Sequence, residues 1–130
     1  MKQIASMLLL LLTRCASSWP SGSYVAEISD ADARVLAASV TEYLAGALRP
    51  GVPVAIPPDG DVLSPVLTAD LRRAGIRQDP NGRRVHYVAA PLDDGVMLRI
   101  SIDNREGASR FFVRSNGSLV VGGPMTVALP

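Results

Sequence analysis

The sequence predicts an α+β fold, in which two helices pack on one face of a mainly antiparallel β-sheet in the order α-β-α-β-β-β-β. Up to Gly82, apolar residues recur mainly at helical spacing. After Gly82 they alternate with a period of two, which is typical of half-buried strands. The dipeptides Asp94-Gly95, Glu106-Gly107 and Asn116-Gly117 follow one another at intervals of 12 and 10 residues, as hairpin turns do.

The N-terminal segment has the layout of a bacterial lipoprotein export signal. Lys2 is followed by nine uncharged residues, 4–12, and then by Cys15, the only cysteine of the chain. Nine helical residues rise only about 14 Å against a hydrocarbon core of about 30 Å, so the segment is too short to span a membrane. We expect residues 1–14 to be a signal peptide and residues 15–28 to be a lipidated cysteine with a flexible tether. Residues 29–130 then form a single periplasmic α+β domain.

Cys15 is the expected lipidation site, since one thiol forms no internal disulfide and two or more acyl chains hold a protein stably on a bilayer. The preceding Arg14 departs from the small residue that lipoprotein signals place there. Ordinary cleavage after Ala16 or Ser17, or an uncleaved tail, therefore remain as alternatives.

Charge and length narrow the classes of function. Residues 15–130 form a chain of 116 residues, enough for one small domain. Of the 13 basic residues Lys2 and Arg14 precede Cys15, so 11 remain against 12 acidic residues, a formal charge of −1. A nucleic-acid-binding protein has a basic excess, so we expect no direct nucleic-acid partner.

The tether contains Trp19, the only tryptophan of the chain, in a Ser/Gly/Pro-rich stretch that has no periodicity. Two interpretations are open for this side chain. The indole rests on the bilayer interface or on the domain, or Trp19-Pro20 docks into a partner protein.

The two helices are indicated by capping signals as well as by spacing. Ser29 and Asp32 have the form of a capping box, and the apolar periodicity behind them predicts a helix over about 30–48. Ser64-Pro65 predicts the start of the second helix, with Asp61 as an earlier alternative, and Gly75 predicts its end.

The predicted strands lie around and after these helices. The run 52–56 is apolar, and its proline at position 53 places it at an edge of the sheet or at the beginning of a strand. In the most regular strand, Val96, Leu98, Ile100 and Ile102 share one face. The later strands are predicted at about 84–91, 96–103, 109–115, 118–122 and 125–129.

Catalytic and metal-binding patterns are missing from the sequence. The only histidine, His86, lies in a predicted strand, and a set of Ser64, His86 and Asp94 lacks the nucleophile elbow of hydrolases. Asp59, Asp61, Asp93 and Asp94 do not form a complete calcium loop and are expected in turns. We therefore predict no enzyme activity, no cofactor and no metal.

Basic residues gather at the end of the second predicted helix and the start of the next strand: Arg72, Arg73, Arg77, Arg83 and Arg84. Such a cluster is either a solvated face or a contact for an acidic partner surface or anionic head groups. Arg72, Arg73 and Arg77, together with Trp19, are the predicted partner-binding residues.

Several segments resemble the conjugal transfer protein TrbH family. They are the leader ending at Cys15, the helical run 36–48, and the segments 67–76, 85–100 and 117–127. The similarity covers nearly the whole chain after the leader, in short elements that are not chemically distinctive. TrbH proteins belong to the mating-pair-formation apparatus of conjugative plasmids, a type IV secretion system. The resemblance implies a non-catalytic assembly role with Cys15 as the lipid site, and it supplies no catalytic or ligand residues.

The expected function is accordingly a structural lipoprotein that is anchored to the outer membrane, with its domain in the periplasm and other secretion-system subunits as partners. The residues after Cys15 lack the aspartate that favours inner-membrane retention. The edge strands at 52–56 or at the C-terminus are expected docking sites by strand addition. The alternative is a periplasmic binding module for a small ligand or peptidoglycan.

Overall fold

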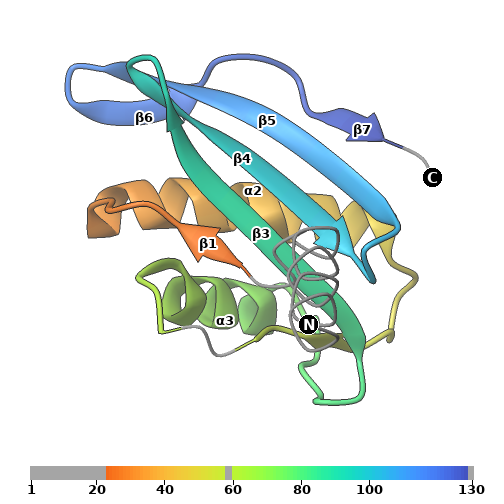
Figure 1. Cartoon of the computed structure of the whole chain (residues 1–130). Helices are drawn as coiled ribbons and strands as arrows, with labels where there is room; N and C mark the ends of the chain where they lie inside the picture. The colour runs from red at the N-terminus through yellow and green to blue at the C-terminus, as the bar shows by residue number, and fades with distance from the viewer. Residues whose placement is uncertain (1–22, 58–59, 129–130) are drawn as a thin grey trace, which may run out of the picture.

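The chain folds into one twisted sheet with two helices on one of its faces, which confirms the predicted α+β class (Figure 1). The computed structural model describes residues 23–57 and 60–128. The elements are β1 (Tyr24–Val25), α2 (Asp30–Ala47), β2 (Val54–Ala55), α3 (Leu63–Arg73), β3 (Arg83–Leu92), β4 (Gly95–Ile102), β5 (Glu106–Ser115), β6 (Ser118–Val121) and β7 (Thr126–Ala128).

The sheet is built on a long antiparallel meander. Its strand order is β1-β3-β4-β5-β6, with β2 paired to β3 and β7 paired to β5. β3 to β7 pair antiparallel, whereas the short strands β1 and β2 run parallel to β3. In Figure 1, β5, β6 and β7 lie along the top of the molecule and α2 lies behind the sheet. No helix among the described residues is long and apolar enough to cross a membrane.

The core lies between the helices and the inner face of the sheet. The predicted alternation is confirmed, because Val96, Leu98, Ile100 and Ile102 are all buried. Each buried Val, Leu or Ile side chain contributes about 1.5–3 kcal/mol relative to the exposed state. Both helices and the strands β3 to β6 contribute to this one cluster: Leu36, Val40, Leu44, Leu63, Leu67, Leu71, Val85, Tyr87, Leu98, Phe112 and Leu119.

Capping explains where the helices begin and end. The Ser29 side chain accepts a hydrogen bond from the Asp32 amide, and α2 starts at Asp30 as predicted. α3 starts at Leu63, one residue before the predicted Ser64-Pro65, because the Asp61 carboxylate accepts the Ser64 amide at 2.6 Å. At its end Gly75 has a φ of +78°, which is the left-handed conformation that favours glycine.

Two of the three predicted hairpin turns lie earlier in the chain. Asn116-Gly117 is confirmed, and both residues have positive φ. The β3–β4 turn is formed by Asp93 and Asp94, because Leu92 already pairs with Gly95. The next turn contains Asp103 and Asn104, whose φ values are 52° and 58°, so Glu106-Gly107 belongs to β5.

The expected tether, 15–28, is too long at its C-terminal end. β1 pairs with β3 through Tyr24↔Val88 and Val25↔Ala89. The Tyr87 amide donates to Ser23 Oγ at 3.1 Å and extends this contact. The domain therefore begins before Ser29. Two strand residues are too few to show an alternating pattern in the sequence.

Candidate interaction surfaces

The predicted lipidation site and the predicted docking tryptophan, Cys15 and Trp19, lie outside the described residues. The first described residue is Ser23, which directly precedes β1 and lies eight positions after Cys15. β1 borders β3 at one margin of the main sheet. A segment that precedes Ser23 thus joins the domain at a sheet margin.

Three arginines of the predicted cluster lie at the end of α3 and just after it. Arg72, Arg73 and Arg77 are all exposed, and Arg73 forms an ion pair with Asp70 one helical turn earlier. In the ranges 23–57 and 60–128, Arg72 and Arg77 have no acidic partner. These two guanidinium groups are available to an external anion.

The charge of the other two arginines of the cluster, Arg83 and Arg84 in β3, is partly neutralised. Arg83 forms an ion pair with Asp103 in the β4–β5 turn, and the Arg84 amide donates to the other oxygen of that carboxylate at 2.8 Å. Burial raises the pKa of Asp103, but the hydrogen bonds from Arg83 and the Arg84 amide outweigh it and leave the pKa below its usual value. Arg83 therefore holds a turn and is not free for a partner.

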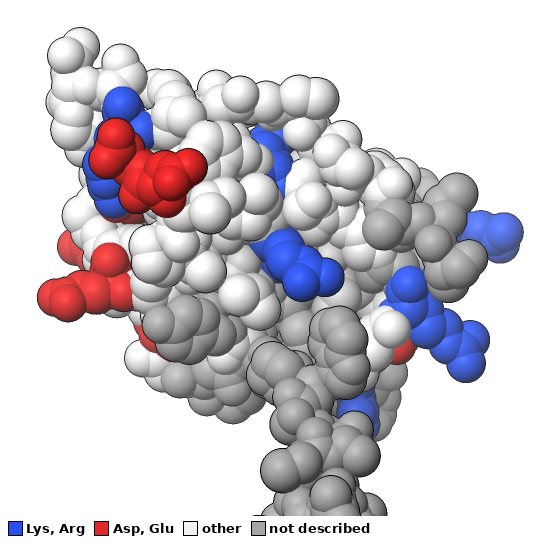
Figure 2. Space-filling view, turned by 45° about the horizontal axis from the view of Figure 1, so that its top comes forward, with Lys and Arg blue, Asp and Glu red and all other residues white. Residues whose placement is uncertain are grey.

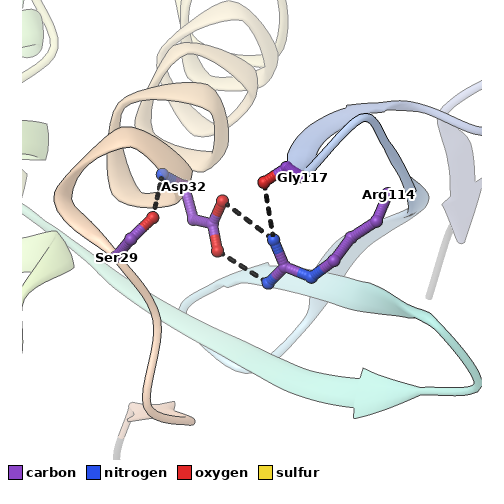
Figure 3. Close-up of polar contacts among 4 residues, drawn as sticks. All are labelled: Ser29, Asp32, Arg114 and Gly117. Atoms are coloured by element: carbon purple, nitrogen blue, oxygen red, sulfur yellow. Dashed lines mark hydrogen bonds and ion pairs between the residues drawn. The ribbon is translucent and has the colours of Figure 1, made fainter.

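A polar contact between β5 and α2 was not predicted. Arg114 Nη2 donates to Asp32 Oδ2 at 2.7 Å and Nη1 donates to Oδ1 at 3.3 Å, as Figure 3 shows. Nη1 also reaches the Gly117 carbonyl at 3.5 Å. The Arg114 hydrogen bond, with Ser29 as a smaller contributor, lowers the pKa of Asp32 despite desolvation, and the same pair raises the pKa of Arg114.

Arg110 lies on the same side of β5 and makes a second bridge to α2. Its Nη1 donates to Ser39 Oγ at 3.2 Å and lies 3.4 Å from Glu42 Oε2. Nε of Arg110 is buried without a hydrogen-bond partner in the described structure. Only the strand register shows that Arg110 lies on the inner face of the sheet: it pairs with Leu98 of β4, whose side chain is buried. Without the pairing of the strands this position cannot be recognised.

A cleft of about 540 Å³ lies between the β1–α2 connection and the β3–β4 turn. Its charged lining comes from the acidic residues Glu27, Asp93 and Asp94 and from Arg114, which is paired with Asp32. Its apolar surface comes from Ala26, Ile28, Pro91 and Val96. The cleft has the size of small-ligand sites and its chemistry suits a group that carries positive charge.

The residues of the possible hydrolase set do not meet. His86 is adjacent in β3 to Tyr87, which faces the core, so the imidazole lies on the opposite face of the sheet from Ser64 in α3. His86 lies near the start of β3, whereas Asp94 follows the end of that strand. Among the described residues no group of histidine, cysteine and acidic side chains is arranged to hold a metal ion.

The two expected docking edges differ. The run 52–56 is not a free edge: β2 pairs with β3, and on its other side the Val54 amide donates to the Arg77 carbonyl at 2.9 Å. The Asp79 amide donates to the Val54 carbonyl at the same distance, so this side is already paired. β7, in contrast, pairs with β5 alone within the described part of the chain.

Comparisons of the chain with protein-family models, with curated proteins and with solved structures gave no match.

Proposed function

We propose that the chain is a non-catalytic lipoprotein of a conjugative type IV secretion apparatus, similar to TrbH. Cys15 anchors it at the periplasmic face of the outer membrane, and the α+β domain contacts other subunits of the mating-pair-formation complex. The function is one of anchoring and assembly.

The observation that carries this proposal is the short distance along the chain between the solitary cysteine and the folded domain. The domain includes Ser23, eight residues after Cys15, whereas the sequence alone suggested a tether up to residue 28. At about 3.3–3.6 Å per residue, eight residues reach at most about 29 Å. A lipid on Cys15 therefore holds the domain close to the membrane surface, where membrane-embedded subunits are within its reach.

The first experiment tests the lipid. The full chain is produced in a conjugation-proficient bacterium with radiolabelled palmitate, next to a Cys15→Ala variant. We expect label and outer-membrane fractionation for the wild type and loss of both for the variant. Label that persists on Cys15→Ala, or a wild-type chain that stays soluble with its leader intact, would refute the anchor.

The second experiment tests the assembly role through Arg72 and Arg77. Pull-down of the tagged, membrane-extracted chain is expected to recover mating-pair-formation subunits, and Arg72→Glu with Arg77→Glu is expected to reduce that recovery most strongly at low salt. The matched control is Arg34→Glu with Arg49→Glu, which makes the same charge change at two other exposed arginines. Equal loss in both double variants would argue against a defined arginine contact.

The cleft beside the β3–β4 turn favours a second candidate function, the binding of a small cationic ligand. Its acidic residues and its volume of about 540 Å³ support this candidate. The test is the shift in melting temperature on addition of peptidoglycan fragments that carry free amines, for the wild type and for Asp93→Asn with Asp94→Asn. No shift in the wild type, or an equal shift in both, would eliminate the candidate.

A further inference from the structure

The edge strand β6 differs in charge from the long strands of the sheet. β3, β4 and β5 each carry at least one arginine, whereas residues 117–127, which include β6 and most of β7, contain no charged side chain. Soluble proteins usually protect an edge strand with charge, proline or a bulge, because its unpaired backbone groups recruit other strands. Here Pro124 lies in the connection between β6 and β7, outside both strands.

The same edge concentrates exposed apolar side chains. Among the described residues five large hydrophobic side chains are exposed, and three of them lie on β6 or β7: Val120, Val121 and Val127, with exposed fractions of 42%, 53% and 56%. In Figure 2 the uppermost margin of the molecule is mostly uncharged, while charged side chains lie at the left and on the face below it. An edge strand without charge is open to pairing with another strand.

The ladder between β5 and β6 determines which backbone groups are unpaired. The Gly122 amide donates to the Phe111 carbonyl at 2.8 Å, so Gly122 points its backbone groups toward β5. In an antiparallel ladder successive residues alternate between the two sides. The N–H and C=O groups of Leu119 and Val121 therefore point away from β5.

We infer that β6 pairs antiparallel with β6 of a second copy of this chain, around a two-fold axis that passes between the two Val120 residues. Leu119 exchanges backbone hydrogen bonds with Val121 of the second copy, and Val121 with its Leu119. The two Val120 residues form the central pair without backbone hydrogen bonds, with Cα atoms about 4.5 Å apart. The two sheets then continue into one, with all helices on the same side.

A second copy is favoured because a two-fold axis places each residue near its own equivalent. A charged edge would set like charges opposite each other, whereas the uncharged edge at 117–127 avoids that repulsion. In this register the outward N–H and C=O groups of Leu119 pair with those of Val121 in the second copy, so both outward-pointing residues of β6 find partners. Val120 lies opposite Val113 on the face away from the helices, so its side chain meets its equivalent without obstruction by α2.

The first test is a cross-link in the full chain, with Cys15→Ala removing the only native thiol. Val120→Cys is expected to form a disulfide-linked dimer under mild oxidation, because the distance between the two Cα atoms of residue 120 across the axis suits a disulfide. Val62→Cys is the control, since Val62 is 43% exposed and lies at the start of α3, away from this edge. Equal cross-linking of both variants, or none for Val120→Cys, would overturn the inference.

The second test measures self-association of the full chain, extracted in detergent and with its native Cys15, by sedimentation over a concentration series. Val120→Glu places like charges across the axis, and Val121→Pro removes an outward N–H without touching the ladder to β5. Each is expected to raise the dimer dissociation constant at least about tenfold, which corresponds to about 1.4 kcal/mol, while Val62→Glu leaves it unchanged. Circular dichroism melting confirms that the variants are folded. A wild-type monomer, or a dimer that both variants leave intact, would refute the pairing.

Discussion

At the scale of single residues, the pair formed by Asp32 and Arg114 joins the first turn of α2 to the far end of β5. Asp32 is only 2% exposed, so its carboxylate depends on the guanidinium of Arg114 for compensation of its lost hydration. Ser29 caps the same helix turn, so the amide and the carboxylate of Asp32 are fixed at the same time. The pair thereby sets the position of α2 along the sheet.

The lowered pKa of Asp32 predicts a dependence of stability on pH. A carboxyl whose pKa is lower in the folded state stabilises the fold at any pH above its pKa in the unfolded chain, about 3.9. This stabilisation is lost as the pH falls through its pKa in the folded state. The wild type is therefore expected to be more stable than Asp32→Asn at pH 7, with a gap that shrinks below about pH 4. Urea unfolding across pH 2–7 measures it, and a gap that does not change with pH would contradict the assignment.

Gly95 predicts a second effect at this scale. A Cβ atom on Gly95 would lie 1.9 Å from the Phe112 carbonyl oxygen, so Gly95→Ala is expected to cost about 1–3 kcal/mol of unfolding free energy. Gly46→Ala in α2 is the control, with no atom within 4 Å of the added group, and is expected to stabilise by about 0.5–1 kcal/mol. Chemical denaturation of both variants checks the pair; similar values for the two would refute the close approach.

At the scale of elements, Asp61 joins the start of α3 to the sheet. Its carboxylate accepts the Ser64 amide, and Tyr87 Oη donates to it at 2.9 Å. Because Tyr87 lies in β3, one side chain both caps the helix and places its N-terminus over the strand. Sequence reasoning left the helix start between Asp61 and Ser64, and the cap explains why the structure has it at Leu63.

This double contact predicts a graded loss of stability. Tyr87→Phe removes the hydroxyl bond and is expected to cost about 0.5–1.5 kcal/mol. Asp61→Ala also removes the cap and is expected to cost about 0.5–2 kcal/mol more. Asp61→Ser keeps a capping oxygen and should recover part of that loss. Thermal unfolding measures the series, and an Asp61→Ala variant no less stable than Tyr87→Phe would contradict it.

The elements that the sequence predicted are those with many residues in one periodic pattern. α2, α3 and the strands from β3 onward follow their apolar spacing closely. The two shifted turns depended on Asp93 and on Asp103-Asn104, which adopt positive φ without a glycine. β1 and the arginine bridges to α2 depend on pairing between distant segments, which no local pattern contains. Arg72, Arg73 and Arg77 are exposed, and their role in partner binding stays a prediction.

At the scale of the whole molecule, the domain includes residues that the sequence assigned to the tether. Val25 and Ile28 pack against the core, and the Ala26 amide donates to the Ala89 carbonyl at 2.9 Å. These contacts cover the edge of β3 that would otherwise be open. The boundary at residue 29 therefore cuts through the folded unit.

This boundary predicts different stabilities for two shortened chains. A chain that begins at Ser29 loses β1 and the partly buried Val25 and Ile28, and is expected to be at least about 1–2 kcal/mol less stable than one that begins at Ser23. It is also expected to aggregate more readily, because the β3 edge becomes unpaired. Calorimetry and light scattering compare the two. Identical melting temperatures would show that β1 contributes nothing to folding.

The parallel pairing of β1 with β3 also has a mechanical consequence. A force applied at the N-terminus, as by a moving membrane anchor, loads the hydrogen bonds of this two-residue strand before it reaches the meander. β1 would then detach first and add its residues to the tether, while the core remains folded. With Cys15 as the proposed anchor, β1 is the part of the described domain that we expect tension to open first.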